Sequence, residues 1–226
     1  MRNLKIFDSF EFGWQYMKRS GILLSMFVLV VGLLSSFMIY MSLPEDFIDM
    51  YMNVLKVGDQ ATLLELQEKI MSKMGVIWVM SLIQTLLYVI AAAVAYQADK
   101  EDRKIAVTDF LFLNVPVLKL IMLVLIFMFA FIIGWSMFII PGIFVAIKFG
   151  QCFYVMIDRP TTGVMEALGK SWYMTRGNFW KLFGFACLCV LLMIVGYFFF
   201  LIGLFFSMAF CIFASIDVFK QLRIDN

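Results

Sequence analysis

The stretch PGIFVAIKFGQCFYVMIDRPTTGVMEALGKSWYMTRGNFWKLFG, residues 141–184, decides the fold class. It opens with a Pro-Gly break, which is expected to turn one membrane span directly into the next. A short apolar run follows, carrying one lysine, Lys148, and it ends at Asp158, Arg159 and Pro160. An amphipathic pattern then leads into another apolar run. An apolar segment, a polar elbow, an amphipathic helix and a further apolar segment, in this order, are typical of a polytopic membrane protein.

Residues 162–176 are predicted to form an amphipathic helix that lies in the membrane surface. Apolar side chains recur every four positions and form a stripe along it: Val164, Leu168 and Trp172. Glu166 and Lys170 are four residues apart on the polar side, where they can form an ion pair. Thr162 is placed to cap the start of the helix, and Gly177 is a stop signal beyond its end. A helix with one apolar and one charged face lies in the interface rather than across the bilayer.

A set of residues along this stretch forms a pattern: Pro141-Gly142-Ile143, Lys148, Glu166-Ala167, Ser171-Trp172, Arg176-Gly177-Asn178 and Trp180-Lys181-Leu182-Phe183-Gly184. The pattern resembles the YciC-like family of bacterial inner-membrane proteins, which is similar to the membrane domain preceding some glycerophosphodiester phosphodiesterases. The match is best over residues 137–185 and weaker over residues 10–21. The resemblance implies six spans and a role in the cell envelope. This chain has no phosphodiesterase domain, so the activity of the fused members is not transferred to it.

The composition assigns the chain to the membrane class. It has 226 residues, of which 64% are hydrophobic and only 15% are charged. Soluble domains carry about 25% charged residues, and a soluble protein of this size could not bury so much Phe, Met, Leu and Ile. We therefore predict an all-α integral membrane protein for which the bilayer is the solvent. The net charge of +2 does not indicate a nucleic-acid partner.

Six apolar segments are predicted to span the membrane within a single domain of residues 1–226. They cover residues 21–43, 75–97, 117–140, 142–157, 179–197 and 203–220. The first is too long for the apolar part of a signal peptide and is expected to be retained. As one helix, the stretch from 179 to 220 would be about 60 Å long, twice the thickness of the hydrocarbon core. It must therefore fold back, and Gly196 and Gly203 bracket the turn.

The segments between the spans suggest a repeated plan. Interfacial helices are predicted near residues 8–19, 108–115 and 162–176, before the first, third and fifth spans, with Trp14 and Trp172 as interfacial anchors. The chain thus reads as three units, each an interfacial helix followed by two spans. Residues 44–74 form a polar, helical excursion outside the membrane. This excursion is either a solvated helical hairpin or a surface that docks a membrane-protein partner.

The residue types that catalysis or metal binding needs are missing or scattered. The chain has no histidine, which removes His-based acid–base chemistry and His ligands. Its four cysteines all lie in apolar runs without C-x-x-C spacing. No Gly-rich phosphate loop follows a strand pattern. We therefore predict no catalytic residues, no metal and no cofactor, and a protein that is not an enzyme.

Lys148 is the one charged residue deep in a predicted span. An unpaired ammonium there costs roughly 2.5–3.5 kcal/mol even on the lenient insertion scale. Three solutions remain open. The side chain snorkels to the polar end, pairs with an acid such as Asp217, or faces a groove and holds an anionic lipid headgroup with Gln151 and Arg176. In the last two cases it points into the bundle or a groove, as we expect, rather than into lipid.

Two functions from different classes remain open. The first is a lipid-interacting or scaffold protein of the cell envelope, with membrane lipids and possibly another membrane protein as partners. The second is a transporter or permease subunit for an apolar or amphipathic solute. Six spans would place 15 of the 18 Lys and Arg residues on one side and only Lys56, Lys69 and Lys73 on the other. The positive-inside bias then predicts a bacterial cytoplasmic-membrane protein with both termini in the cytoplasm.

Overall fold

The computed structural model describes residues 4–42, 47–57, 60–110, 116–137, 139–198 and 200–224. In these ranges the regular structure is helical throughout, without a strand. Six helical segments are long and apolar enough to cross a membrane: Ile6–Met38, Leu63–Lys100, Val117–Ser136, Ile140–Asp158, Phe179–Phe198 and Gly203–Arg223. The prediction of an all-α, multi-pass membrane protein with six spans is therefore confirmed.

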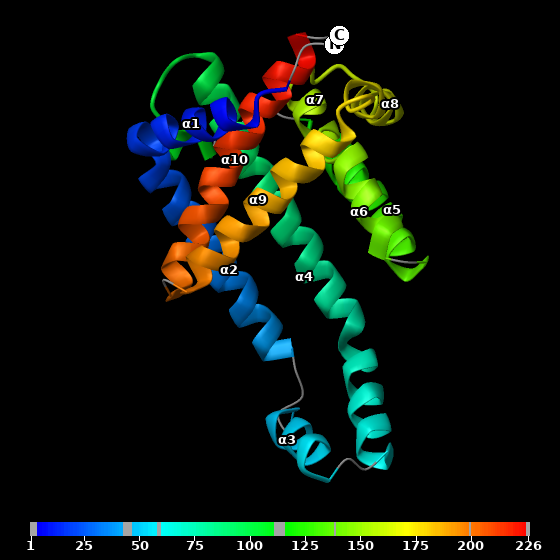
Figure 1. The fold of residues 1–226 in the computed structure, drawn as a ribbon. Coiled ribbons are helices and arrows are strands. Elements are labelled where there is room, and N and C mark those ends of the chain that lie inside the picture. Colours follow the sequence, from blue (N-terminus) through cyan, green and yellow to red (C-terminus); the bar gives the residue numbers. More distant parts are fainter. Residues whose placement is uncertain are drawn as a thin grey trace. The chain divides into compact units, whose positions relative to one another are not determined.

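The chain divides into two compact units. The bundle unit comprises Met1–Leu29 and Leu86–Asn226, and the excursion unit comprises Val30–Thr85. Within the bundle unit, α9 and α10 form one antiparallel hairpin, and α5 and α6 form another (Figure 1). The single domain expected for residues 1–226 stays a prediction.

The excursion unit holds the end of α2 (Ile22–Ser42), α3 (Phe47–Val57) and the first part of α4 (Gln60–Lys100). The predicted excursion, residues 44–74, is helical where it is described; residues 43–46 and 58–59 lie outside the described ranges. Its second half and the second span form one helix of 41 residues, about 60 Å long at 1.5 Å per residue. Lys69 pairs with Glu65 at 3.4 Å and donates to Met50 Sδ at 3.4 Å. The choice between a solvated hairpin and a docking surface stays open.

The first interfacial helix and the first span form one helical run with a bend. α1 (Ile6–Tyr16) passes through a π-helix, Met17–Gly21, into α2. Figure 1 shows α1 crossing α10, while α2 leaves in a different direction. π-helical turns are a recognised cause of helix kinks, since they add a residue to one turn. The prediction of a helix near residues 8–19 with its own direction is thus matched by α1.

The buried faces of α1 and α8 (Val164–Met174) consist mainly of small residues and not of large apolar side chains. In α8 the buried residues are Ala167, Ser171 and Met174, and in α1 they are Ser9 and Gly13. Trp172 of the predicted stripe is 43% exposed and Trp14 is 50% exposed. The apolar stripe therefore does not supply the buried residues of α8. In a membrane, close approach of backbones favours small residues at helix contacts, and large apolar side chains can face lipid.

The ends of α8 correct one predicted cap and confirm one predicted stop. Gly163 occupies the N-cap, and its N–H donates to Glu166 Oε2 at 3.5 Å, whereas Thr162 lies buried one residue earlier. Glu166 also accepts from Lys170 at 2.6 Å, as predicted. This ammonium holds the pKa of the Glu166 carboxyl below its ordinary value. Gly177 has φ 87°, a left-handed conformation that suits glycine after a helix end.

The third and fourth spans are joined earlier than predicted. α5 (Val117–Met137) and α6 (Ile139–Phe149) flank residue 138, which lies outside the described ranges. Pro141 therefore sits in the first turn of α6, where its missing N–H does no harm, and not at the turn itself. Gly142 serves the contact between the two helices: a Cβ on Gly134 would come within 3.1 Å of its Cα. The fourth span breaks again before α7 (Cys152–Asp158).

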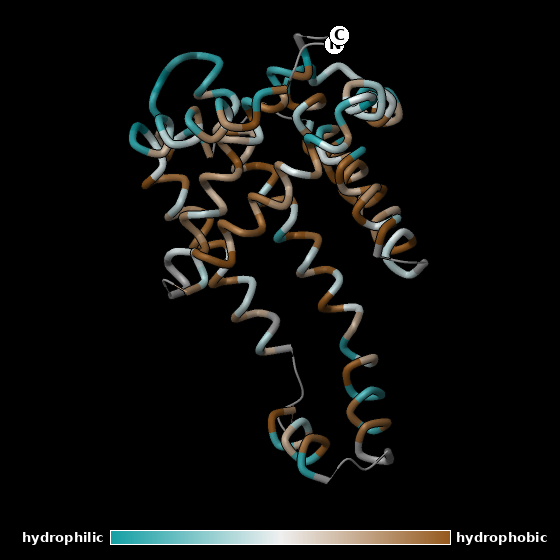
Figure 2. The backbone as a smooth tube through the Cα atoms, in the orientation of Figure 1, coloured by the Kyte–Doolittle hydropathy of each residue, from teal (hydrophilic) through white to brown (hydrophobic). Residues whose placement is uncertain are grey.

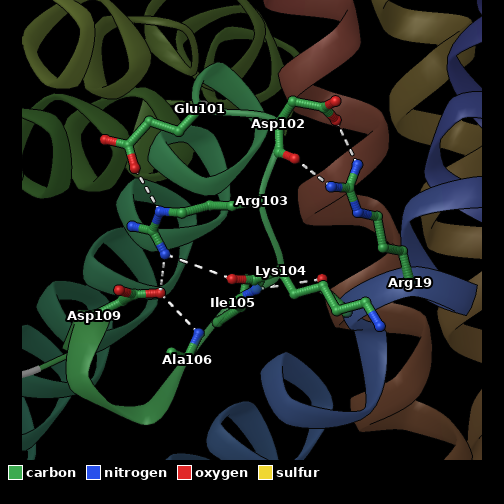
Figure 3. A network of polar contacts seen from close by, with 9 residues as sticks. Arg19, Glu101, Asp102, Arg103, Lys104, Ile105, Ala106 and Asp109 are labelled. Atoms are coloured by element: carbon green, nitrogen blue, oxygen red, sulfur yellow. Dashed lines mark hydrogen bonds and ion pairs between the residues drawn. The ribbon is translucent and has the colours of Figure 1, made fainter.

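The loop after α4 is held by ion pairs and hydrogen bonds (Figure 3). Of residues 108–115, the described part belongs to a 3₁₀ helix, Val107–Phe110; residues 111–115 lie outside the described ranges. The Asp109 carboxylate accepts from Arg103 Nη1 at 2.5 Å and from the Ala106 N–H at 2.7 Å. The Arg103 guanidinium holds the pKa of the Asp109 carboxyl below its ordinary value. Arg19 binds the side chain and the carbonyl of Asp102.

The last two spans, α9 (Phe179–Phe198) and α10 (Phe200–Ile224), form the predicted hairpin. The two helices come close together at Gly196. A Cβ added there would come within 2.4 Å of Ser207 Oγ and 2.6 Å of the Gly203 carbonyl oxygen. Glycine is therefore required here for contact between helix backbones, as in other membrane helix pairs.

Substitution Gly196→Ala tests this contact. Because the Gly203 carbonyl is backbone and cannot rotate away, we expect a loss of stability of about 1–3 kcal/mol, as for other overpacked contacts. The measurement is the unfolding free energy in detergent micelles. The matched control is Gly75→Ala in α4, where an added Cβ meets nothing within 4 Å. That change should be neutral or stabilising by up to about 1 kcal/mol; equal effects of the two variants would contradict the close contact.

Candidate functional site

The polar end of α10 ties together helices that are distant in the sequence. Asp217 accepts from Ser9 of α1 at 2.7 Å, and the Lys5 N–H donates to Gln221 Oε1 at 2.9 Å. Lys220 forms an ion pair with the buried carboxylate of Asp99 at the end of α4. Figure 2 shows hydrophilic residues gathered at this end of the bundle unit, around the end of α10 and the loop after α4.

A second buried carboxylate, that of Asp158 at the end of α7, lies at the centre of the site. Its side chain is 5% exposed. Tyr96 of α4 donates its hydroxyl to Asp158 Oδ1 at 2.8 Å, and Arg223 of α10 donates to the same oxygen at 2.8 Å. Lys100 and Arg159 lie at 3.7 and 3.8 Å from the carboxylate. One carboxylate therefore faces three cations, which leaves positive charge available at the surface.

Beside this carboxylate lies a pocket of about 500 Å³, here called the α7–α8 pocket. It is lined by Val155, Asp158, Arg159, Glu166, Gly169, Lys170, Tyr173, Met174, Phe219 and Arg223. Val155, Met174 and Phe219 supply an apolar surface, and the charged residues supply the polar part. The volume lies within the range of ordinary small-molecule and headgroup sites, about 300–1,000 Å³.

A lysine of α5 holds the elbow between α7 and α8 in place. Lys119, in the first turn of α5, donates to the carbonyl oxygens of Pro160, Thr161 and Thr162 at 3.0, 3.3 and 3.4 Å. Its ammonium thus satisfies three backbone carbonyls that lie between α7 and α8, outside both helices. The chain between Asp158 and α8 is therefore fixed by defined bonds, and the pocket has an ordered wall.

The predicted site residue Lys148 lies elsewhere, at the contact between α6 and α8. It is 7% exposed, and its ammonium donates to the Thr175 carbonyl oxygen at 3.4 Å. The same ammonium lies 5.2 Å from the Trp172 ring centroid and 5.7 Å from that of Phe144. Ser171 Oγ donates to the Lys148 carbonyl oxygen at 2.7 Å. Lys148 thus points into the protein, as expected, and aromatic faces with a carbonyl stabilise its charge.

The structure does not gather the three predicted ligand residues into one site. Gln151 lines a different cavity, between α6, α7, α9 and α10, and Arg176 is exposed beyond the end of α8. Asp217, the proposed acid for Lys148, instead accepts from Ser9 and Gln221. The two predicted anchors, Trp14 and Trp172, are half-exposed, as an interfacial anchor requires.

The sequence did not indicate that the residues around Asp158 form one pocket. Asp158 is predicted only to end an apolar run, and no pattern in the sequence gives Arg223 or Tyr96 a role. One signal was present, because Asp217, Lys220 and Arg223 recur every three residues and so lie on related faces of α10. Such a charged face at a span end needs partners, but nothing in the pattern names them. Within the described ranges, no three His, Cys, Asp or Glu side chains gather as a metal site.

Comparisons with protein-family models, curated proteins and solved structures give no match to this chain. The geometry of the bundle unit is therefore the basis for inferring its function.

Tyr96→Phe tests the arrangement around Asp158. Removing a hydroxyl that donates to a buried carboxylate should lower the unfolding free energy by about 1.5–3 kcal/mol, the usual worth of a hydrogen bond to a charged group. Unfolding in micelles is the measurement. Tyr173→Phe removes the same atom from an exposed tyrosine that lines the α7–α8 pocket and should leave stability unchanged. A Tyr96 variant as stable as the Tyr173 variant would show that this bond does not hold the helices together.

Proposed function

We propose that the protein is a non-enzymatic, lipid-interacting membrane protein that binds the anionic headgroup of a phospholipid in the α7–α8 pocket. The surplus of cations around the buried Asp158 carboxylate carries this proposal. Lys100, Arg159 and Arg223 surround one carboxylate, while Glu166 and Lys170 neutralise each other. A phosphate group would supply the missing negative charge.

The residue types suit a phosphate at a membrane surface. Arginine presents planar, paired N–H donors that match phosphate oxygens, and it remains charged at any working pH. The side chains of Arg159 and Arg223 are 61% and 46% exposed, so their free donors can reach a headgroup. Val155, Met174 and Phe219 offer apolar surface to the part of the lipid next to the phosphate. Charge and apolar surface together favour an amphiphile over a free, fully hydrated anion.

The alternative function, a transporter subunit, would be favoured by a polar cavity that contains Lys148. Lys148 lines neither the α7–α8 pocket nor the cavity at Gln151. Its ammonium instead contacts Trp172 and Thr175, so its role in this proposal is to join α6 and α8. Lipid binding is therefore the function that we favour.

Retention of anionic lipid by an Arg159→Gln variant tests the proposal. Arg159 is exposed and its ion-pair partner is its own neighbour Asp158, so its loss should leave the fold intact. In nanodiscs that mix phosphatidylglycerol with phosphatidylcholine, we expect about tenfold weaker retention of phosphatidylglycerol, measured by native mass spectrometry. That factor corresponds to one charge-assisted hydrogen bond of roughly 1.5 kcal/mol.

The matched control for this experiment is Lys18→Gln, which removes an exposed cation of the π-helix outside the pocket. It should leave retention unchanged. Equal retention in wild type and Arg159→Gln would show that the pocket does not hold the lipid. An equal loss in both variants would show that general surface charge holds it instead.

The location and family follow as parts of the same proposal. Residues 141–184 support membership of the YciC-like group in the bacterial cytoplasmic membrane, and the cation distribution supports cytoplasmic termini. Single cysteines in a background without the four native ones test the orientation. A cysteine at Asp102 should react with an impermeant thiol reagent only after the cells are opened, whereas one at the exposed Ser72 should react in intact cells. The reverse result would invert the topology.

A further inference from the structure

A second cavity lies among the spans themselves, between α6, α7, α9 and α10. Its volume is about 310 Å³. It is lined by Ala146, Ile147, Gly150, Gln151, Tyr154, Leu182, Phe185, Ala186, Cys189, Met193, Cys211 and Ser215. None of these side chains is a carboxylate or a cation, and most are apolar. We call it the Gln151 cavity.

The amide of Gln151 is the feature that calls for a ligand. The residue is 8% exposed, and its Oε1 is buried without a hydrogen-bond partner in the part of the chain that the structure describes. A buried, unpaired carbonyl loses its bonds to water and gains none in return, so native proteins rarely leave one. A missing hydrogen-bond donor in a cavity of this size is most simply supplied by a bound molecule.

Two hydroxyl groups add to the polar lining. Tyr154 donates to the Ile212 carbonyl oxygen at 3.4 Å, and Ser215 donates to the Cys211 carbonyl oxygen at 2.7 Å. Each hydroxyl has thereby used its only proton and retains lone pairs. Gln151 adds an unpartnered acceptor, Oε1, and its Nε2 amide group is a donor, so the lining offers uncharged groups of both kinds.

We propose that the Gln151 cavity binds the hydroxyl-bearing end of a neutral, apolar lipid. An uncharged lining with a buried, unpartnered acceptor demands a donor without a net charge, which excludes a phosphate or an ammonium. A hydroxyl donates to Gln151 Oε1 and can also accept from its Nε2, whereas an ether or a hydrocarbon chain donates nothing. At roughly 30 Å³ for each water-sized group, the cavity holds about ten such groups, or one medium-length chain.

This site is distinct from the headgroup pocket. The two cavities share no lining residue, and adjacent residues of α7 separate them, because Tyr154 lines the Gln151 cavity and Val155 lines the α7–α8 pocket. The lining of the α7–α8 pocket carries charged side chains, and that of the Gln151 cavity does not. The inference therefore does not depend on the proposed phospholipid binding.

Photolabelling with a decan-1-ol that carries a diazirine in its chain tests the inference, with the corresponding methyl ether as the matched probe. In the wild-type protein, in micelles, we expect saturable labelling of cavity residues such as Cys189 and Met193, competed by unlabelled decan-1-ol. The ether should label about fivefold less, since it cannot donate. Labelled positions are mapped by mass spectrometry of peptides.

Two variants make the result specific. Gln151→Leu keeps the side-chain size and removes the acceptor, so the difference between alcohol and ether should vanish; the melting temperature shows whether the variant is folded. Ala186→Phe fills the cavity and should abolish labelling by both probes, while Arg159→Gln should change neither. Equal labelling by alcohol and ether in wild type, labelling that does not saturate, or an alcohol preference that survives Gln151→Leu would each overturn the inference.

Discussion

A buried carboxylate that joins three helices organises the polar end of this bundle. Asp158 receives hydrogen bonds from Tyr96 of α4 and Arg223 of α10. The desolvation of such a carboxylate is costly unless charged and hydrogen-bonding partners surround it. Since those partners come from helices far apart in the sequence, the bond network fixes which span ends lie together. The surplus of positive charge that results is what suits the neighbouring pocket to an anionic group.

The spans could be predicted from the sequence, while the site could not. Hydropathy over about 20 residues is a local property, and the bilayer thickness sets its scale. The bounds of α5, α9 and α10 therefore lie close to the predicted ones. The partners of Asp158 are 62 and 65 residues away, and no local pattern encodes such a pairing. The buried face of α8 could not be predicted either, for a related reason. In a membrane the apolar stripe of a helix can face lipid, so hydrophobicity does not identify the side that packs against protein.

The buried faces of the two helices that flank the bundle give physical support to the predicted repeat. Small residues at matching four-residue spacing are buried in both: Ser9 and Gly13 in α1, Ala167 and Ser171 in α8. In each case a half-exposed tryptophan follows the second small residue, Trp14 or Trp172. α1 packs on α10, the last span, and α8 packs on α6 and α7, the fourth span. In the predicted plan the fourth span ends the second unit and α8 begins the third, so α8 lies against the last span of the unit before it. If the three units are taken to close into a ring, α10 is likewise the last span of the unit before α1. Full threefold repetition stays a prediction, because residues 111–115 of the middle helix lie outside the described ranges.

The break within the fourth span explains why two chemically different cavities lie so close together. α6 ends at Phe149 and α7 begins at Cys152, with Gly150 and Gln151 between them. The backbone tolerates the break because the Gly150 N–H still reaches the Ala146 carbonyl at 2.9 Å and the Val155 N–H reaches the Gln151 carbonyl at 3.2 Å. In an unbroken helix, the directions of the side chains after Gln151 would follow directly from those of α6. The short α7 instead starts anew, with Tyr154 toward the uncharged cavity and Val155 and Asp158 toward the charged pocket. The broken span still satisfies the backbone groups named above, as a segment within the hydrocarbon core requires, so the polar demand that remains at this point is that of the Gln151 side chain.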